Sequence, residues 1–359
     1  MKLKLIEDKI NMFRFGHLYF NISADAFLKC FDYGDSVYVR VNGTKTMEVP
    51  VCGSYEDLFP GEPAIRVTAE EQKISLIRNC GAIGVEYGIL KKAEPGSELP
   101  YTLTDDLILP VEADIELAEK AKFLKKTVLS RLTYSTSRED YHTDISDSGF
   151  ANFREIRTTG MKPGNLYRSA SPIDPFSGRN EAADRLAREA GIRTIINLSD
   201  SKEKGYSYPG FSDTYSSGCN IAFVSMSVSY RSDEFRDMLA SCMRAIIEYE
   251  GPYMFHCLLG KDRTGFVAAV FELLMGAGID EVKEDFLKTY ENLYGGLKDG
   301  SGHLDEEKKD LIRQMCSATI LYAMGLNDEK ELCDGGAVEN YLMYIGLTPD
   351  EIEKVKAAL

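Results

Sequence analysis

The chain has 359 residues, of which 44% are hydrophobic and 28% are charged, so it is large enough for two folded domains. Its formal net charge of -15 is the opposite of the basic footprint that non-specific nucleic-acid binding needs, and we expect no nucleic-acid partner. Eight scattered cysteines with no C-x-x-C pair, and only four histidines, argue against a disulfide scaffold or a structural zinc site, so no metal or other cofactor is expected.

The start of the chain gives no sign of a secretion signal or a membrane anchor. Residues 1–8 contain acids where a signal peptide has its apolar segment. No stretch approaches the ~18 uninterrupted apolar residues of a transmembrane helix. We therefore expect a cytoplasmic protein without a transmembrane segment.

Residues 1–112 are predicted to form a small, mostly-β barrel or sandwich domain. Residues 35–41 alternate in character and run into Asn42-Gly43, the strongest short hairpin signal, and a returning strand follows to about Val51. Gly and Pro separate two further expected strands, at residues 64–68 and 74–77.

Residues 113–359 are predicted to form an α/β domain with a central, mainly parallel sheet flanked by helices, because strand and helix patterns alternate there. A helix is expected at 114–129 and a loop at 134–149. The alternating elements are a helix at 180–189, strands at 194–198 and 221–226, a helix at 233–249, a strand at 253–255 and a helix at 264–275. Several helices are expected from residue 281 onward.

The segment at residues 256–265, which reads HCLLGKDRTG, lies between the last strand and helix of this alternation. A tight loop in this position turns successive backbone N–H groups inward, and with the helix N-terminus they form a nest for a tetrahedral anion. The same field favours the thiolate form of Cys257, and Arg263 can bind two phosphoryl oxygens as a planar fork. The expected phosphate-binding residues are Leu258, Leu259, Gly260, Lys261 and Arg263.

These residue types indicate nucleophilic phosphoryl transfer that needs no metal. The Cys257 thiolate would attack phosphorus and form a phosphocysteine, which water then hydrolyses. Thr264 is placed to donate its hydroxyl to the sulfur when the sulfur becomes the leaving group. An inert core cysteine at the end of a buried strand is the alternative for Cys257, and the surrounding segment argues against it.

A general acid must protonate the leaving oxygen, and two aspartates are candidates. Asp262, inside the loop beside Arg263, is the first choice, and Asp233, which follows a loop that could overhang the site, is the alternative. A helix N-cap is at least as good an explanation for Asp233. We expect His256 to order the loop by hydrogen bonding and Lys261 to contact additional phosphates of the substrate.

The loop resembles that of the protein tyrosine phosphatase superfamily, specifically a bacterial branch whose pattern H-C-x-x-G-K-D-R-T-G is matched in full. The segments NFRE at 152–155 and GNLYRS at 164–169 are similar to the elements that open this branch, and VENYL at 338–342 with IGLT at 345–348 to its closing helices. The resemblance covers about residues 150–359. It implies Cys257 as the nucleophile, Arg263 as the phosphate ligand and Asp262 as the acid within the loop.

The resemblance also implies a phosphorylated protein, a phosphoinositide or an inositol phosphate as the substrate. Residues 197–199 read NLS where the family tends to carry Asp-Leu-Arg, and the chain has no Trp and hence no Trp-Pro-Asp acid loop, so the substrate stays open. Arg154 and Arg168 are expected to be structural ion-pair residues rather than substrate contacts.

Within the first 112 residues, a second resemblance rests on GDSV at 34–37, GEPA at 61–64 and NCGA at 79–82. These segments resemble the C-terminal β domain of S-adenosylmethionine hydroxide adenosyltransferases. The other half of that enzyme is not found in the chain, so no adenosyltransferase activity is expected, and we interpret residues 1–112 as an accessory module.

The sequence therefore favours a phosphatase that works through a phosphocysteine intermediate. The alternative from the class of binding proteins is a catalytically silent phosphate-binding module whose N-terminal β domain dominates its function. The intact Cys257, Asp262 and Arg263 argue against that alternative, since a protein that only binds phosphate could lose any of them. A sulfur-transfer or arsenate-reducing loop is disfavoured because no resolving cysteine lies near in sequence.

Overall fold

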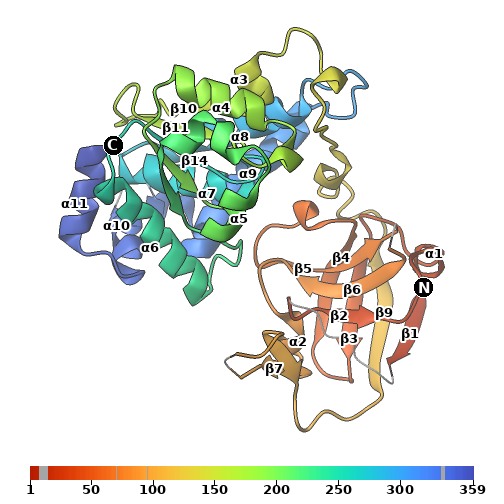
Figure 1. The fold of residues 1–359 in the computed structure, drawn as a ribbon. Coiled ribbons are helices and arrows are strands. Elements are labelled where there is room, and N and C mark those ends of the chain that lie inside the picture. The colour runs from red at the N-terminus through yellow and green to blue at the C-terminus, as the bar shows by residue number, and fades with distance from the viewer. Residues whose placement is uncertain (8–14, 70, 95, 333–335) are drawn as a thin grey trace. The chain divides into compact units, whose positions relative to one another are not determined.

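In a computed structural model, the chain is described at residues 1–7, 15–69, 71–94, 96–332 and 336–359. It divides into two compact units, Met1–Arg131 and Leu132–Leu359, each with a sheet of its own (Figure 1). Cys333 lies outside the described residues, and the other seven cysteines are free thiols.

The N-terminal unit is built on a seven-stranded sheet in the order β1-β9-β3-β4-β5-β6-β2, in which only β4 and β5 are parallel neighbours. Its strands are β1 (Lys2–Glu7), β2 (Leu18–Phe20), β3 (Ser36–Val41), β4 (Thr46–Cys52), β5 (Pro63–Thr68), β6 (Lys73–Arg78) and β9 (Val111–Glu119), with a separate pair formed by β7 (Leu90–Lys92) and β8 (Tyr101–Leu103). Two short helices, α1 (Ala24–Leu28) and α2 (Ile83–Glu86), complete it. Whether this sheet is best classed as a barrel or a sandwich stays a prediction.

The predicted hairpin of this unit is confirmed. β3 and β4 pair antiparallel, and the turn between them places both Asn42 and Gly43 at positive φ, as a hairpin turn matching the twist of the strands requires. Val37, Val39 and Val41 point into the core, while the residues between them face outward.

The predicted helix at 114–129 is wrong, because this part of the chain begins with the strand β9. Val111, Ala113 and Ile115 are buried and the residues between them are more exposed, which is the two-residue period of a strand. β9 pairs with β1 on one side and β3 on the other. The boundary predicted at about residue 112 therefore falls inside a central strand, and the structure divides after Arg131 instead.

The C-terminal unit has a five-stranded sheet in the order β10-β11-β14-β12-β13, parallel except for β10. The strands are β10 (Arg154–Glu155), β11 (Leu166–Ser169), β12 (Thr194–Asn197), β13 (Asn220–Phe223) and β14 (Tyr253–His256). The helices are α3 (Asp147–Phe150), α4 (Asn180–Glu189), α5 (Lys202–Ser207), α6 (Asp233–Glu248), α7 (Asp262–Leu274), α8 (Ile279–Tyr294), α9 (Glu306–Met324), α10 (Gly336–Tyr344) and α11 (Pro349–Ala358).

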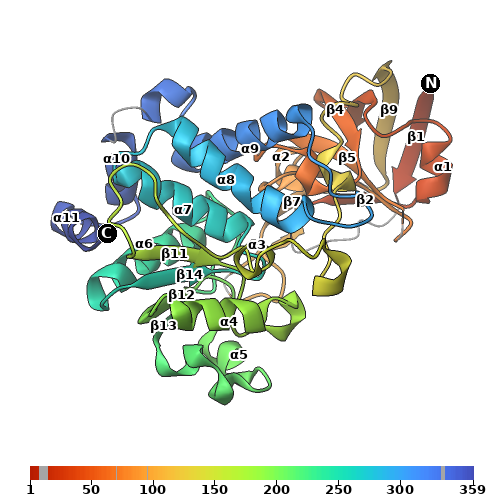
Figure 2. The same ribbon diagram turned by 90° about the horizontal axis from the view of Figure 1, so that it is seen from above.

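Helices cover both faces of this sheet, as predicted. Figure 2 shows α4 and α5 on one side, with α7, α8 and α9 on the other. Side chains alternate accordingly along β14: Met254 packs in one core cluster with Ala183 and Ala187 of α4, and the Phe255 ring lies 5.7 Å from that of Phe271 in α7. The central strand is thus fixed from both faces, and its carboxyl end leads into the predicted site.

Candidate active site

The candidate site is the loop of residues 257–261, between the end of β14 and the start of α7. β14 lies between β11 and β12, and since all three run parallel, their carboxyl ends meet at one edge of the sheet. Ligands of open α/β sheets bind at such an edge. Cys257, the predicted nucleophile, is the first residue of the loop and only 4% exposed.

Gly260 lets the loop pass very close to the end of β11. Its φ is +69°, and a Cβ at this position would lie 2.7 Å from the carbonyl carbon of Ser169 and closer still to its oxygen. Only glycine combines this backbone conformation with so close an approach. Beside it, the N–H of Ser171 donates to the carbonyl oxygen of Leu258 at 3.1 Å. One side of the loop is therefore fastened to the chain that follows β11.

Three successive N–H groups of the loop are free donors. The backbone N–H groups of Leu258, Leu259 and Gly260 donate no hydrogen bond to any residue that the structure describes. Unpaired N–H groups in succession, directly before a helix, form a binding site for an anion. This arrangement agrees with the nest expected from the sequence.

Arg263 lies in the first turn of α7 and reaches across the neighbouring strands. Its Nη1 donates to the carbonyl oxygens of Leu198, just after β12, at 3.4 Å and of Met226, after β13, at 3.2 Å. Among the described residues, no carboxylate forms an ion pair with it. The guanidinium is therefore held in place by backbone carbonyls while its charge stays available to an oxyanion.

Two buried polar atoms next to this loop have no hydrogen-bond partner within the described ranges, Thr264 Oγ1 and His256 Nε2. The other ring nitrogen of His256 lies 3.3 Å from the carbonyl oxygen of Cys257. Burial lowers the pKa of His256 to about 4, so its ring is neutral at pH 7. A neutral ring beside the Cys257 carbonyl fits the expected ordering role better than proton transfer.

The two candidate acids have different surroundings. Asp262 is the first residue of α7, and its side chain is 54% exposed beside Arg263. Asp233 is the first residue of α6, 91% exposed and 3.0 Å from Arg236 Nη1. The N-cap of α6 is Ser232 and not Asp233, which corrects the capping interpretation.

Lys261 does not extend into solvent. Its side chain is 7% exposed, and its Nζ lies 3.0 Å from the Asp262 carboxylate and 5.4 Å from the centroid of the Tyr290 ring. A contact with additional substrate phosphates stays a prediction, and it would have to compete with this ion pair.

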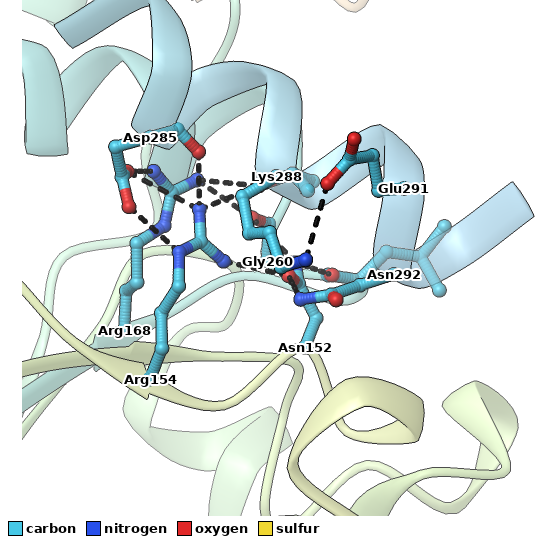
Figure 3. Close-up of polar contacts among 10 residues, drawn as sticks. Asn152, Arg154, Arg168, Gly260, Asp285, Lys288, Glu291 and Asn292 are labelled. Carbon is cyan, nitrogen blue, oxygen red and sulfur yellow. Dashed lines mark hydrogen bonds and ion pairs between the residues drawn. The ribbon is translucent and has the colours of Figure 1, made fainter. Parts of the chain in front are cut away.

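Behind the loop, two arginines share one aspartate of α8 (Figure 3). Arg154 Nε lies 2.7 Å from Asp285 Oδ1, and the buried Arg168 pairs with the other oxygen. Arg168 Nη2 also donates to the carbonyl oxygen of Gly260 at 3.1 Å. Burial alone would raise the pKa of Asp285, but the two guanidinium charges hold it well below its usual range. The expectation that both arginines form structural ion pairs is confirmed.

The amide of Asn152 completes this support. Its Nδ2 donates to the carbonyl oxygens of Leu259 and Gly260, at 3.1 and 3.2 Å. Its Oδ1 accepts from Arg154 Nη1 at 2.7 Å and from Asn292 Nδ2 at 3.1 Å. Both N–H groups and both lone pairs of the amide are thereby used, which fixes its orientation beneath the loop.

Sequence reasoning did not single out Asp285 or Asn292. Each stands within a helix among other polar residues, and no local pattern marks it as the partner of a distant side chain. Asn152 and Arg154 belonged to a recognised segment, but the contact of Asn152 with the loop and the pairing of Arg154 with Asp285 were not foreseen. These contacts could not be predicted from local sequence, since α8 and the loop come close together only in the folded unit.

In the described ranges, no group of three or more His, Cys, Asp or Glu side chains is arranged to hold a metal ion. In the same ranges, no helix combines the length and apolar character needed to cross a membrane.

A family model described as "Tyrosine phosphatase family" matches residues 145–359. The triple specificity protein phosphatase PtpB of Mycobacterium tuberculosis (strain ATCC 25618 / H37Rv) is 24% identical over 253 residues, covering 56% of this chain and 87% of that protein.

Among solved structures, P. aeruginosa TpbA matches 58% of this chain and 99% of its own at 16% identity, with a TM-score of 0.32. The core catalytic domain of the PP-IP phosphatase SIW14 from S. cerevisiae matches 46% and 93% at 16% identity, with a TM-score of 0.28. An uncharacterized conserved protein from Thermotoga maritima matches 32% of this chain at 21% identity and a TM-score of 0.24, and the chain spans about a third (35%) of that protein. Likenesses of this size do not establish a shared fold.

Proposed function

Because the chain belongs to the tyrosine phosphatase family, we propose that it hydrolyses phosphomonoesters through a phosphocysteine intermediate on Cys257. It is a tyrosine-phosphatase-like hydrolase. The observation that carries the mechanism is the loop itself: three free N–H groups and the unpaired charge of Arg263 surround a buried cysteine at a sheet edge.

In the first step the thiolate of Cys257 attacks phosphorus. An S–P bond forms while the bond from phosphorus to the leaving oxygen breaks, and that oxygen takes up a proton. The N–H nest and Arg263 stabilise the charge on the equatorial oxygens. Water then attacks the phosphocysteine, and Thr264 donates its hydroxyl to the departing sulfur. The unpartnered Oγ1 of Thr264 supports this assignment.

For the general acid we propose Asp262. Both aspartates form an ion pair, Asp262 with Lys261 and Asp233 with Arg236, but the half-exposed carboxyl group of Asp262 stands at the start of α7, next to Arg263. In the segment 221–232 no acid is present, so the loop after β13 offers no carboxyl group of its own before Asp233.

For the substrate we propose phosphotyrosine in a protein, a phosphoinositide or an inositol phosphate. Membership of the tyrosine phosphatase family supports phosphotyrosine as a substrate. The relative PtpB is named a triple specificity protein phosphatase, which supports a site that accepts more than one kind of phosphoester. We propose that the N-terminal unit is an accessory module.

The test is phosphate release from an aryl phosphate, a phosphotyrosine peptide and a phosphoinositide panel, with EDTA present. Cys257→Ser should abolish turnover on every substrate, because the hydroxyl is a far weaker nucleophile than the thiolate. The control, Cys219→Ser, changes a partly exposed cysteine of the same unit and should keep full activity. If the wild type binds phosphate analogues but releases no phosphate, the proposal fails and a silent phosphate-binding module takes its place.

A further inference from the structure

The hydroxyl of Tyr208 lies between two buried carboxyl groups. Its oxygen is 2.8 Å from Asp174 Oδ2 and 3.0 Å from Asp200 Oδ1. All three side chains are buried, so water does not separate them. These distances are those of hydrogen bonds on both sides of one phenol.

The two aspartates stand on opposite sides of the catalytic loop. Asp174 belongs to the chain that leaves β11, and Asp200 to the chain that leaves β12. These two strands flank β14, whose end carries Cys257. The contact through Tyr208 therefore joins the two chain segments, after β11 and after β12, that border the loop at the carboxyl edge of the sheet.

On the β11 side, Ser171 connects this contact to the loop. Its Oγ accepts a hydrogen bond from the N–H of Asp174 at 3.0 Å, and its own N–H donates to the carbonyl oxygen of Leu258 at 3.1 Å. A shift of Asp174 is thus transmitted to the loop through one residue.

On the β12 side, the connection runs to Arg263. Asn197 holds Asp200 through both ends of its amide, with Nδ2 donating to Oδ2 at 3.1 Å and Oδ1 accepting from the Asp200 N–H at 3.0 Å. Leu198, one of the two residues between them in the chain, offers the carbonyl oxygen that accepts from Arg263 Nη1. The place of Asp200 therefore helps to set the place of the phosphate-binding guanidinium.

The hydroxyl of Tyr208 donates toward both carboxyl groups. A phenol has one proton to donate and an ionised carboxylate can only accept, so both carboxyl groups depend on this one hydroxyl for their contact with each other. Asp200 is the anionic end: burial would raise its pKa, but hydrogen bonds from Lys204, Asn197 and Tyr208 hold the pKa of Asp200 below its ordinary value. Tyr208 is therefore among the donors that stabilise the Asp200 carboxylate, and the same hydroxyl donates toward Asp174.

We propose that Tyr208 is a positioning residue of the active site: its hydroxyl clamps Asp174 to Asp200 across the end of β14 and so holds Arg263 in its phosphate-binding place. This inference rests on the proposed function, because it assigns Tyr208 a role in the same site. Tyr208 acts through Leu198 and does not itself contact the substrate.

The clamp has a pH dependence that a merely structural contact would lack. The charged and titratable groups that face it are Asp174, Asp200, Lys204, whose Nζ lies 5.6 Å from the Tyr208 ring centroid, and His256, whose charge would interact with that of Asp200. In Tyr208→Phe no proton lies between the carboxyl groups, and near neutral pH they repel each other. In acid, protonation weakens this repulsion, so the two carboxyl groups are no longer driven apart.

The experiment compares Tyr208→Phe with Tyr206→Phe, a control two residues earlier, in α5, whose exposed ring is not part of the clamp. Inhibition by tungstate, an inert oxyanion, and kcat/KM on an aryl phosphate are measured at about pH 7.5 and about pH 5.0, each as a ratio to the wild type at that pH. We expect Tyr208→Phe to weaken tungstate inhibition about tenfold at the higher pH and less than about threefold at the lower, as loss of a charge-assisted hydrogen bond predicts. Tyr206→Phe should change neither.

An equal loss at both pH values, or the same loss in Tyr206→Phe, would overturn the inference. If Tyr208→Phe unfolds, Asp174→Asn takes its place: its amide oxygen still accepts the hydrogen bond from the phenol, so tungstate inhibition should stay within about twofold of the wild type. A tenfold loss in that variant would overturn the inference too. Absence of turnover in the wild type would instead refute the proposed function. If the wild type is active but the ratio of Tyr208→Phe to wild type is the same at both pH values, only the role of Tyr208 is refuted.

Discussion

Replacing Gly260 by alanine tests how the loop of residues 257–261 keeps its shape. The added methyl group meets two obstacles at this position. The φ of +69° belongs to the left-handed region that L side chains avoid, and the Cβ would press against the carbonyl group of Ser169 and the N–H of Ala170, 3.0 Å away. The opposing atoms are backbone at the end of β11, so they cannot turn aside as a flexible side chain would.

The magnitude can be worked out from these two effects. The left-handed conformation costs about 1–2 kcal/mol in a non-glycine residue. Forcing a methyl group into a well-packed place adds about 1–3 kcal/mol. We therefore expect Gly260→Ala to lose about 2–5 kcal/mol of the free energy of unfolding, and at least about 100-fold in kcat/KM, because a shift of about 1 Å in a positioning loop has that effect.

A matched control separates the two effects. Gly164 has nearly the same φ, +72°, but a Cβ there would meet nothing within 4 Å. Gly164→Ala should lose only about 1–2 kcal/mol in urea unfolding and keep its activity. If the two variants prove equally stable and equally active, the close approach to β11 does not shape the loop, and the reasoning is refuted.

Asp285→Asn should cost about 3–5 kcal/mol in urea unfolding, because it leaves the buried guanidinium of Arg168 and the partly buried one of Arg154 without this anion. Glu284→Gln, in an exposed pair of the same helix, should cost less than about 1 kcal/mol, and equal losses would contradict the structural role of Asp285. Acid should destabilise both units through their buried histidines. The pKa values of His17 and His256 are lowered from 6.5 to about 4 in the folded protein, so the unfolded chain takes up these protons at a higher pH. The free energy of unfolding therefore has its full value above about pH 6.5. It falls by up to about 3 kcal/mol per histidine as the pH drops to 4. Urea titrations at pH 7 and pH 5 measure this, and unchanged midpoints would contradict it.

The sequence was most informative where structure is local. The strand at 253–255, the glycine of the loop and the following helix could be predicted because each depends on a few neighbouring residues. The helix begins at Asp262 rather than Thr264, and the strand predicted at 221–226 ends at Phe223. Such ends depend on pairing and capping, which a pattern specifies only to within a few residues.

The prediction failed where the outcome depends on partners far along the chain. Residues 111–119 are rich in Glu and Ala, which favour a helix, yet two flanking strands impose an extended conformation on them. Asp285 and Asp200 looked like ordinary surface acids in the sequence. The fold brings Arg168 to the first and Tyr208 to the second, and no local pattern announces contacts made across the sheet edge.

The support behind the loop also sets the order in which a newly made chain can become active. The ribosome releases β11, the cysteine loop and α7 before α8, so Arg154 and Arg168 first emerge with no Asp285 beside them. At the usual pace of synthesis, roughly one to six seconds separate the appearance of Cys257 from that of Asp285. During that interval the nascent chain already carries the thiol of Cys257, the proposed nucleophile, while the loop around it is not yet held in shape.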